Sequence, residues 1–435
     1  MPTNPSPYQV AIIGAGAAGY FCALNLAQKL KDNGVDPELY QISIFEKAAV
    51  GLRKVRISGG GRCNVTHDEE DNLKFLKHYP RGQRQLRTPL YEFNAMDTRQ
   101  WFEKRGVKLK IEKDGRIFPV TNSSQTVIDC FNKEAQRLGV TIYHKSKVEG
   151  ITYLPPHFQI NPTCNEEDLP KKFHYLCLAT GSDPQGHKLA QDLGHSFSEF
   201  APSLFTFKCQ HPLLRNLQGT SFKNAEVKIV GRELKGLKLK ESGPLLITHW
   251  GLSGPAILKI SAWGARELKR ANYHFPFRVN FLGMSLDETR ERLLSYKKMN
   301  LKKKITTSAP LEDLTHKFWA SVIEFHKLSP DLQWANLSQK EINLICESLT
   351  SLELQSTGPH RHKEEFVECG GVSSQEINFK TLQSKLIEGL YFAGELLDID
   401  GITGGFNFQN AWSTSYNAAM DIAQKITQNQ KELKI

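Results

Sequence analysis

The sequence lacks the cysteine patterns that mark disulfide chemistry or metal binding. Its eight cysteines are scattered, without a CxxC pair or the spacing of a metal site. This absence disfavours a disulfide reductase and predicts that no metal is bound. Scattered thiols are typical of a reducing compartment, so we expect a cytoplasmic protein. The chain also shows no basic segment followed by an apolar one near its start, and we expect no secretion signal.

Extreme composition is absent as well. Of the 435 residues, 40% are hydrophobic and 23% are charged, which is typical of a globular protein and not of a disordered or fibrous one. A chain of this length is too long for one simple core, so we expect two or three structural units. The uncharged run that ends at Lys29 is nearly long enough to span a membrane. Its glycine spacing gives a better explanation, and we predict no membrane association.

That run contains a glycine pattern typical of dinucleotide binding. Val10–Ile13 predicts a buried parallel strand, and Gly14, Gly16 and Gly19 follow as G-x-G-x-x-G before an alanine- and leucine-rich helix. The first glycine permits a tight turn, the second lets a pyrophosphate approach the backbone, and the third lets helix and strand pack closely. A second strand, QISIFEK, leads to Glu46, which can accept a hydrogen bond from a ribose hydroxyl. Together these features predict a dinucleotide site, whereas the glycines alone would also fit a turn that binds nothing.

Three further glycines favour FAD over NAD as the dinucleotide. The segment ISGGGRCN holds Gly59, Gly60 and Gly61 at a point where an NAD dehydrogenase would normally proceed into its next helix. A loop there would lie along an extended FAD, close to the isoalloxazine ring, and side chains would collide with that ring. We therefore predict that these glycines make room for the flavin.

Four motifs resemble a bacterial family of FAD-binding flavoproteins. They are GAGAAG at Gly14, RKVRISGGGRCNVT at Arg53, GPLLITHWGLSGPAIL at Gly243 and GLYFAGELLDIDGITGGFNFQNAW at Gly389. The family includes the ribosomal RNA dihydrouridine synthase and oxidoreductases named for the bile-acid pathway or for aminoacetone. The resemblance implies a Rossmann-like α/β fold in which both chain ends build the FAD-binding domain, with a β-rich and a helical domain inserted.

The residue pattern agrees with that architecture. The predicted domains are 1–200 with 356–435 for FAD binding, 201–285 for the β-rich domain and 286–355 for the helical domain. Short alternating segments such as AEVKIV, GLKLK and PFRVNF predict strands between Phe205 and Leu282, and one helix is expected to start at Pro255. Helical periodicity then dominates from Leu286 to Leu354.

The C-terminal motif is a second candidate for contact with the flavin ring. Its glycines are expected to keep side chains away from a flat group, although a connection that binds nothing would also fit. A helix that begins at Gly405-Phe406-Asn407 can direct its dipole at the N1–C2=O edge of the flavin and stabilise the reduced ring. The full set of predicted cofactor contacts is Gly14, Ala15, Gly16, Gly19, Glu46, Lys47, Lys54, Gly59, Gly60, Gly61, Arg62, Asn64, Ala179, Thr180, Gly181, Gly394, Glu395, Asp400, Gly401, Gly404, Gly405, Phe406 and Asn407.

Positive charge is concentrated in two parts of a chain whose net charge is +10. Residues 201–355 hold 23 Lys and Arg against 14 Asp and Glu, and residues 51–150 hold 20 against 12. Two runs, KHYPRGQRQLR (Lys77–Arg87) and YKKMNLKKK (Tyr296–Lys304), mix basic side chains with Tyr or His. Such runs suit a phosphate backbone with exposed bases to stack upon. A solvated basic surface is the commoner explanation of any one run, and both interpretations stay open.

The resemblance implies an FAD-dependent oxidoreductase that uses NAD(P)H and reduces a uridine of large-subunit ribosomal RNA to dihydrouridine. The reduced flavin would give a hydride to uracil C6, an acid would protonate C5, and the base would have to be single-stranded or flipped out. A second G-x-G-x-x-G is absent, so either the nicotinamide docks transiently on the flavin or the electrons come from elsewhere. The alternatives are a small-molecule enone or amine oxidoreductase and a non-catalytic, flavin-carrying RNA-binding assembly factor. The oligomeric state stays open.

Cys63 is the candidate acid. A thiol beside the flavin loop can protonate C5 if its reach and pKa are suitable, and the neighbouring Arg62 could lower that pKa. His249 and Glu395 are competing candidates for the same role. The plainer interpretation is that Cys63 is a small buried packing residue, as free cysteines usually are.

Overall fold

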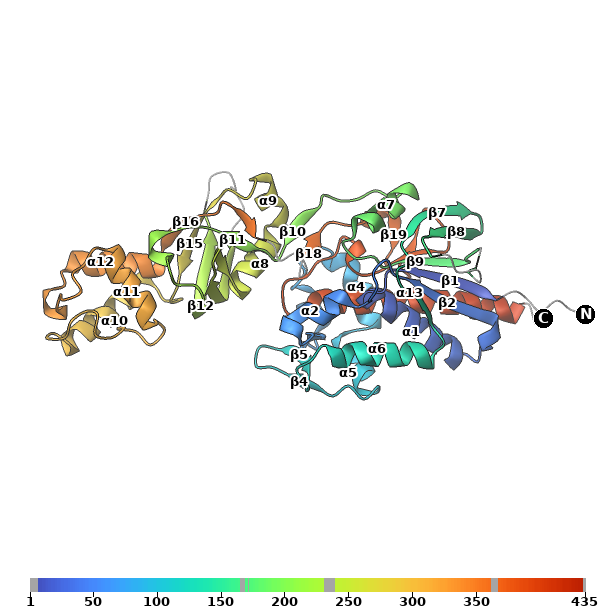
Figure 1. Ribbon diagram of the computed structural model, residues 1–435, viewed down its shortest axis with the longest axis horizontal. Coiled ribbons are helices and arrows are strands. Elements are labelled where there is room, and N and C mark those ends of the chain that lie inside the picture. Colours follow the sequence, from blue (N-terminus) through green and yellow to red (C-terminus); the bar gives the residue numbers. More distant parts are fainter. Residues whose placement is uncertain (1–6, 165–168, 171, 231–238, 361–366, 433–435) are drawn as a thin grey trace, which may run out of the picture. The chain divides into compact units, whose positions relative to one another are not determined.

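The computed structural model describes residues 7–164, 169–170, 172–230, 239–360 and 367–432 (Figure 1). The chain divides into two compact units: unit 1 contains Met1–Phe200 and Val367–Ile435, and unit 2 contains Ala201–Phe366. The division therefore falls after Phe200 and before Val367, where the sequence suggested residues 200 and 356, and the predicted domain limits stay a prediction. The further division of the inserted part at residue 286 stays a prediction.

Unit 1 is built on a seven-stranded sheet with the order β19-β20-β21-β9-β1-β2-β6. The central strand β1 (Tyr8–Ile13) pairs in parallel with β2 (Tyr40–Phe45) on one side and with β9 (Tyr175–Leu178) on the other. β6 (Thr141–Tyr143) and β21 (Leu390–Phe392) extend the parallel part, and β19 (Ile377–Asn378) and β20 (Gln383–Ser384) close one edge antiparallel. A parallel sheet buried on both faces explains the uninterrupted apolar runs of β1 and β9. The predicted Rossmann-like α/β class is confirmed.

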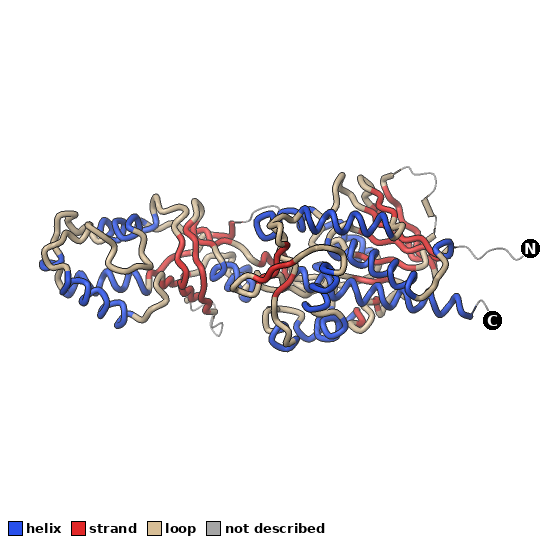
Figure 2. The backbone as a smooth tube through the Cα atoms, turned by 90° about the horizontal axis from the view of Figure 1, so that it is seen from below, coloured by secondary structure: helices blue, strands red, loops and turns tan. Residues whose placement is uncertain are grey.

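The helices of unit 1 come from both ends of the chain. α1 (Ala17–Asp32) follows β1 and lies beside the long C-terminal helix α13 (Phe406–Glu432), which Figure 2 shows running along the unit. The other helices are α2 (Arg53–Gly61), α3 (Asn72–Leu76), α4 (Gln83–Glu92), α5 (Ala95–Glu103), α6 (Gln125–Arg137) and α7 (Pro184–Asp192). The remaining strands are β3 (Thr66–His67), β4 (Leu109–Ile111), β5 (Arg116–Pro119), β7 (Val148–Leu154), β8 (His157–Pro162) and β18 (Val367–Cys369).

Unit 2 joins an antiparallel sheet to a group of helices. The sheet has the order β16-β15-β12-β13-β14-β11-β17, and α10, α11 and α12 gather at one end of the unit (Figure 1). Its strands are β10 (Ala201–Ser203), β11 (Thr206–Lys208), β12 (Ser221–Ile229), β13 (Lys240–Ile247), β14 (Gly251–Ser253), β15 (Pro276–Asn280), β16 (Leu352–Gln355) and β17 (Gly358–His360). Its helices are α8 (Pro255–Trp263), α9 (Ala265–Arg270), α10 (Leu286–Met299), α11 (His316–Phe325) and α12 (Gln339–Thr350).

One buried cluster runs through unit 2, from Phe205 on the sheet side to the stacked indoles of Trp319 and Trp334 among the helices. The helix predicted from Pro255 is in fact two helices, α8 and α9, separated at Gly264. A Cβ at Gly264 would overlap the end of the Leu239 side chain, so the break falls at a close contact between the helices and that leucine. The predicted strand GLKLK lies mostly outside the described residues, and β13 begins at its last residue.

Within the described ranges, no helix is both long and apolar enough to cross a membrane. The same residues contain no group of three or more His, Cys, Asp and Glu side chains that could hold a metal ion.

Candidate functional site

The turn between β1 and α1 gives each glycine of the first motif a different environment. Gly14 has φ +106°, and a Cβ there would lie 2.6 Å from the Ala179 carbonyl oxygen. A Cβ at Gly19 would overlap the carbonyl oxygen of Gly14. At Gly16, by contrast, no atom lies within 4 Å of an added Cβ. The first and third glycines therefore serve the close packing of strand, turn and helix, and the second faces open space where a ligand can approach.

The start of α1 is suited to an anion. Gly16 is the residue that precedes the first helical turn, and no side-chain hydrogen bond caps that end. The first backbone N–H groups of a helix have no partner within the helix, and the helix dipole adds partial positive charge there. A pyrophosphate at Gly16 would accept these N–H groups.

Glu46 lies directly at this turn. It follows β2, and its two carboxylate oxygens accept the backbone N–H groups of Ala15 (2.9 Å) and Ala48 (2.8 Å). Each oxygen keeps lone-pair capacity for a further donor such as a ribose hydroxyl. Burial and the charge of Glu46 raise the pKa of Tyr20 to about 12. Lys47, also predicted as a contact, forms an ion pair with Asp183 at 2.7 Å, and its contact with a cofactor stays a prediction.

The second glycine segment is a short helix with a left-handed break, not the open loop that the sequence suggested. α2 is anchored to the first turn, because the Leu52 N–H donates to the Ala15 carbonyl (2.8 Å). Its backbone leaves the helical region at Ser58, and Gly60 has φ +69°. A Cβ at Gly60 or Gly61 would meet no atom within 4 Å, so the backbone is open on that side.

The β4–β5 hairpin holds the break in place. The Arg62 guanidinium lies 3.9 Å from the ring centre of Phe118 and pairs with Glu112 at 2.7 Å. A Cβ at Gly59 would lie 2.9 Å from the same ring. Asn64 is buried, and its side-chain oxygen accepts the Ile117 N–H (3.2 Å). Arg62 and Asn64 thus fasten the glycine segment to the hairpin, and their contact with a cofactor stays a prediction.

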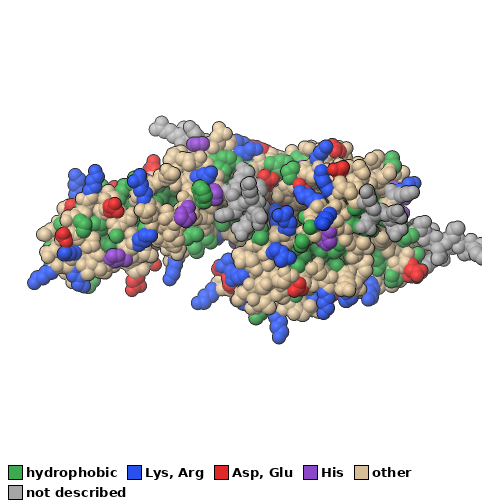
Figure 3. Space-filling model, viewed as in Figure 1, with side chains coloured by type: hydrophobic (Ala, Val, Ile, Leu, Met, Phe, Trp, Pro, Cys, Tyr) green, Lys and Arg blue, Asp and Glu red, His purple; other side chains and the backbone are tan. Residues whose placement is uncertain are grey.

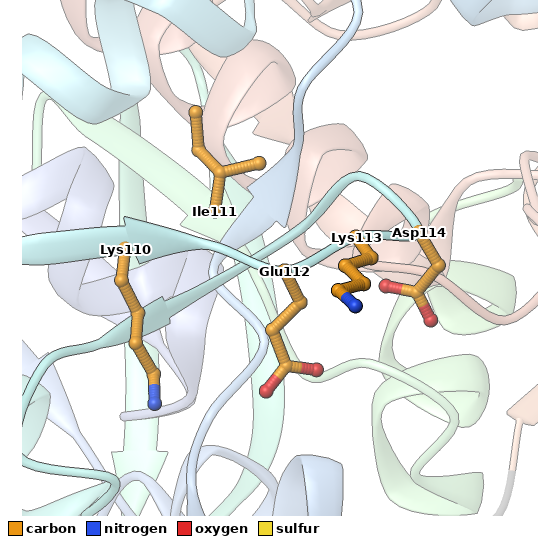
Figure 4. A pocket seen from close by; sticks show the side chains of 5 residues that line it. All are labelled: Lys110, Ile111, Glu112, Lys113 and Asp114. Atoms are coloured by element: carbon orange, nitrogen blue, oxygen red, sulfur yellow. The ribbon is translucent and has the colours of Figure 1, made fainter.

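A surface hollow lies at the tip of the same hairpin. It is lined by the consecutive residues 110–114, and Figure 4 shows Ile111 pointing away from Lys110 and Glu112. That alternation is the normal geometry of a strand. Only these five consecutive residues line the hollow, and none of them belongs to the predicted motifs.

Cys63 is completely buried, with φ 60°. Burial raises the pKa of its thiol to about 12, against the smaller opposing effect of a hydrogen bond with Ser58. The thiol is therefore protonated at neutral pH, but no part of it is open to solvent. This environment favours the packing interpretation, and the acid role stays a prediction.

Three distant parts of the sequence meet at Lys54. Its ammonium pairs with Glu395 of the C-terminal motif and donates to the Ser182 hydroxyl (3.2 Å). A Cβ at Gly181 would lie 3.5 Å from the same Glu395 carboxylate. The neighbouring Thr180 hydroxyl is buried without a hydrogen-bond partner among the described residues. The structure thus brings these predicted residues together at the carboxyl ends of parallel strands, where open α/β sheets bind ligands. Ser182 is a member that sequence reasoning missed.

The C-terminal glycines are packed against protein atoms. A Cβ at Gly394 would lie 2.9 Å from Ala18, and one at Gly404 or at Gly401 would press on Phe406 at 2.7 or 2.6 Å. Gly405 has φ +98°, and a Cβ there would lie 2.7 Å from the backbone of Thr66. Internal packing gives these glycines a reason of their own, different from the flat ligand expected from the sequence.

Two side chains of this motif are also engaged within the protein. Asp400 forms a two-pronged ion pair with Arg81, and the Arg81 Nε to Asp400 Oδ1 distance is 2.5 Å. The Asn407 amide bonds both the N–H (2.8 Å) and the carbonyl (2.9 Å) of Gly401. These contacts shape the start of α13, so a direct role in cofactor binding stays a prediction for both residues.

An aromatic cluster at the start of α13 escaped the sequence reasoning. Phe406 stacks on His78 with ring centres 4.3 Å apart and lies 4.8 Å from His67. His67 Nδ1 lies 3.1 Å from the Gly404 carbonyl oxygen, and burial lowers the pKa of its imidazole. His67 and His78 can be seen in the sequence, in the segments CNVTH and KHYP, but neither segment indicates that both rings contact Phe406.

The two basic runs are partly neutralised within their own units. In the first, Arg81 is paired as described, while Arg84 and Arg87 are exposed on α4. In the second, Lys304 pairs with Asp331 at 2.6 Å, and Lys302 is exposed. On the face drawn in Figure 3, Lys and Arg side chains lie scattered among uncharged ones. His249, another candidate acid, lies exposed in unit 2.

A family model described as the HI0933-like protein Rossmann domain matches residues 8–421. The chain belongs to this family. It is 28% identical over 429 residues to a protein of Escherichia coli named ribosomal RNA dihydrouridine synthase, which covers 95% of this chain and 98% of the relative. A Haemophilus influenzae protein of the same name is 26% identical, with the same two coverages. A 3-dehydro-bile acid delta(4,6)-reductase of Clostridium scindens is 27% identical and covers 96% of this chain and 99% of the relative.

Membership of the HI0933-like family confirms the resemblance predicted from the four motifs. The match begins at the first residue of β1 and ends within α13. It therefore includes both halves of unit 1 and the whole of unit 2, so the inserted unit is part of the family pattern.

Proposed function

We propose that this chain is an FAD-dependent oxidoreductase that reduces a uridine of large-subunit ribosomal RNA to dihydrouridine, with NAD(P)H as the reductant. The observation that carries the FAD part is the open space at Gly16 and at Gly60, on two segments that are joined through the Ala15 carbonyl. The two relatives named ribosomal RNA dihydrouridine synthase, matched over almost their whole length, support the RNA part.

The residues of unit 1 fit an extended dinucleotide. The start of α1 offers N–H groups to a pyrophosphate, and Glu46 offers carboxylate oxygens to a ribose. When bound, the flavin supplies a hydride for C6 of the uracil. The protein has to hold the base against the ring, exclude water and provide a proton at C5.

The proton donor can be found by separating two rates. In our proposal Cys63 is one candidate, with Glu395 and His249 as competitors. If Cys63 donates the proton, Cys63→Ala leaves flavin reduction by NAD(P)H near the wild-type rate and slows flavin reoxidation by RNA at least about a hundredfold. If both rates survive, Cys63 packs the core, as its burial favours. Loss of flavin would assign it to the support of the cofactor site.

The decisive experiment compares ribosomal RNA from a wild-type strain and from a strain that lacks this protein. Dihydrouridine mapping should show one position of the large-subunit RNA that loses its modification and regains it when the gene is restored. Unchanged RNA would contradict the proposed substrate. The cofactor is tested separately: mass analysis of the group released from the purified protein should give FAD, and FMN or no flavin after reconstitution would contradict the cofactor assignment.

A second candidate function is reduction of a small-molecule enone. It is favoured by the relative named 3-dehydro-bile acid delta(4,6)-reductase, which matches this chain at nearly the same identity as the two synthases. Conjugated enones and uracil present a similar carbon–carbon double bond next to a carbonyl group. Turnover of a steroid enone by the NAD(P)H-reduced protein, with unmodified ribosomal RNA inert, would favour this candidate. Absence of flavin turnover together with tight RNA binding would favour a non-catalytic assembly factor.

A further inference from the structure

The third sequence motif, GPLLITHWGLSGPAIL, places an unusual side chain on the surface of unit 2. Trp250 is 55% exposed, although tryptophan is usually well buried. It lies in the turn between β13 and β14, where the Thr248 hydroxyl accepts the N–H groups of Trp250 (3.3 Å) and Gly251 (3.2 Å). The turn is therefore fixed by the Thr248 side chain and does not depend on the indole ring.

The exposed indole is also held flat. It stacks on the imidazole of His360, with ring centres 4.5 Å apart and planes inclined by 18°. His360 belongs to β17, at the edge of the antiparallel sheet. A ring that already stacks on a second ring and stays more than half exposed has lost part of its rotational freedom, so it can bind a ligand at a reduced entropic cost.

Lys208 lies on the same face of the sheet as His360, the ring on which Trp250 stacks. Thr206 pairs with His360 and Lys208 pairs with Gly358, and residues two positions apart in a strand share a face. Gly251 on β14 is the other cross-strand partner of Lys208. The neighbouring pair Phe207 and Leu252 points the other way and is completely buried. The row Gly251–Lys208–Gly358 thus carries one cationic side chain between two positions without side chains. No ion-pair partner of Lys208 is present in the described part of the chain.

We propose that Trp250 and Lys208 form a docking site for single-stranded RNA, with an unpaired base on the indole and a phosphate at the ammonium group. The inference rests on the proposed RNA substrate and deepens it by naming a contact surface. Aromatic side chains that stack on bases, combined with cationic side chains that hold phosphates, are the common arrangement for binding unpaired RNA. The excess of 23 Lys and Arg over 14 Asp and Glu in residues 201–355 makes the surrounding field favourable to a polyanion.

The test uses the full-length protein and a single-stranded, uridine-rich oligonucleotide. Stacking of a base on Trp250 quenches its fluorescence, and Trp250→Phe should abolish most of that signal while keeping affinity within a few fold. Trp250→Ala should weaken binding about 5- to 150-fold, the range expected when one stacking side chain is removed. Leu344→Ala, at another exposed apolar position of the unit (40%), is the matched control and should bind as the wild type does.

Salt dependence separates the two side chains. Lys208→Ala should reduce the slope of log affinity against log salt by about 0.7, the value for one phosphate contact on a single strand. Trp250→Ala should lower affinity at every salt concentration and leave that slope unchanged. The proposal is overturned if Trp250→Ala binds the oligonucleotide like the control, or if a flat steroid enone quenches Trp250 and RNA does not.

The outcome is independent of the reaction itself. If ribosomal RNA keeps its dihydrouridine in the deletion strain while Trp250→Ala still weakens RNA binding, the docking site stands and the proposed reaction fails. If the modification is lost in the deletion strain while Trp250→Ala binds normally, the reaction stands and this site is wrong. A thermal unfolding midpoint equal to that of the wild type shows that each variant is folded.

Discussion

Two alanine substitutions three positions apart should have opposite consequences. Gly16→Ala places a methyl group where no atom lies within 4 Å, at a backbone position (φ −84°, ψ −169°) that any residue can adopt. Gly19→Ala places the same methyl group onto the carbonyl oxygen of Gly14. Helix propensity alone predicts the reverse order, because Gly19 lies inside α1 and alanine is the better helix former by about 1 kcal/mol.

The magnitudes follow from the space available. In Gly16→Ala, replacing a glycine just before the helix destabilises the folded state, whereas the lower entropy of the unfolded chain stabilises it. The two effects roughly cancel, so the free energy of unfolding should change by less than about 1 kcal/mol. For Gly19→Ala the strand–helix contact has to open, and overpacking of this kind costs about 1–3 kcal/mol or more. A methyl group in the space proposed for the pyrophosphate should cost Gly16→Ala a similar amount in binding, which is an affinity loss of about 5- to 150-fold.

The assay combines thermal unfolding, followed by circular dichroism, with titration of the apoprotein by FAD. Gly16→Ala should unfold near the wild-type temperature and bind FAD weakly, whereas Gly19→Ala should unfold earlier or fail to accumulate. Wild-type FAD affinity in Gly16→Ala would refute the placement of the pyrophosphate at this turn. Wild-type stability in Gly19→Ala would refute the packing that the structure gives to the third glycine.

Three further outcomes can be measured without a substrate. Asp400→Asn removes the charge of the carboxylate that pairs with the largely buried Arg81 and should cost about 3–5 kcal/mol in urea unfolding, while the exposed Arg84→Ala should stay within about 0.5 kcal/mol. A thiol reagent at pH 8 should modify Cys164 rapidly in the native protein, because the other cysteines are buried, and rapid labelling of Cys63 would contradict its environment. Burial lowers the pKa of His195 below 6.5, so as pH drops the unfolded state is protonated at His195 before the folded state. The free energy of unfolding should therefore fall as pH drops below about 6.5. His195→Asn should reduce the slope of this decline with pH, and an unchanged slope would refute the assignment to His195.

Local sequence was sufficient wherever one residue's environment is set by its neighbours in the chain. The strand before Gly14, the turn and α1 form one continuous segment, and the roles of its glycines follow from backbone geometry. The same holds for α10, α11 and α12, because the spacing of the apolar residues within each segment is enough to predict a helix there. Fold class and the position of the first glycine turn were therefore predictable.

Pairings between distant residues were not predictable in this way. Asp400 and Arg81 are separated by 319 positions and Glu395 and Lys54 by 341, and no local pattern indicates which carboxylate meets which cation. As a result Arg81 was counted with an RNA-binding run and Asp400 with the cofactor contacts, whereas the structure joins them in one ion pair. A count of charges along the chain cannot distinguish a neutralised arginine from an exposed one.

Glycine-rich motifs have a similar limit, since a glycine shows that a side chain is excluded but not what excludes it. At Gly401 and Gly404 the excluding group is the Phe406 side chain, and at Gly16 and Gly60 no protein atom is present. Openness by itself marks no site, because ordinary surface glycines are open too. What distinguishes Gly16 and Gly60 is their connection: α2 starts from the Ala15 carbonyl, and its five helical residues, Arg53–Ile57, carry the chain roughly 8 Å along to the break that begins at Ser58. Two open backbone positions, rigidly linked and separated by such a length, suit an elongated ligand that touches both, as the proposed FAD would.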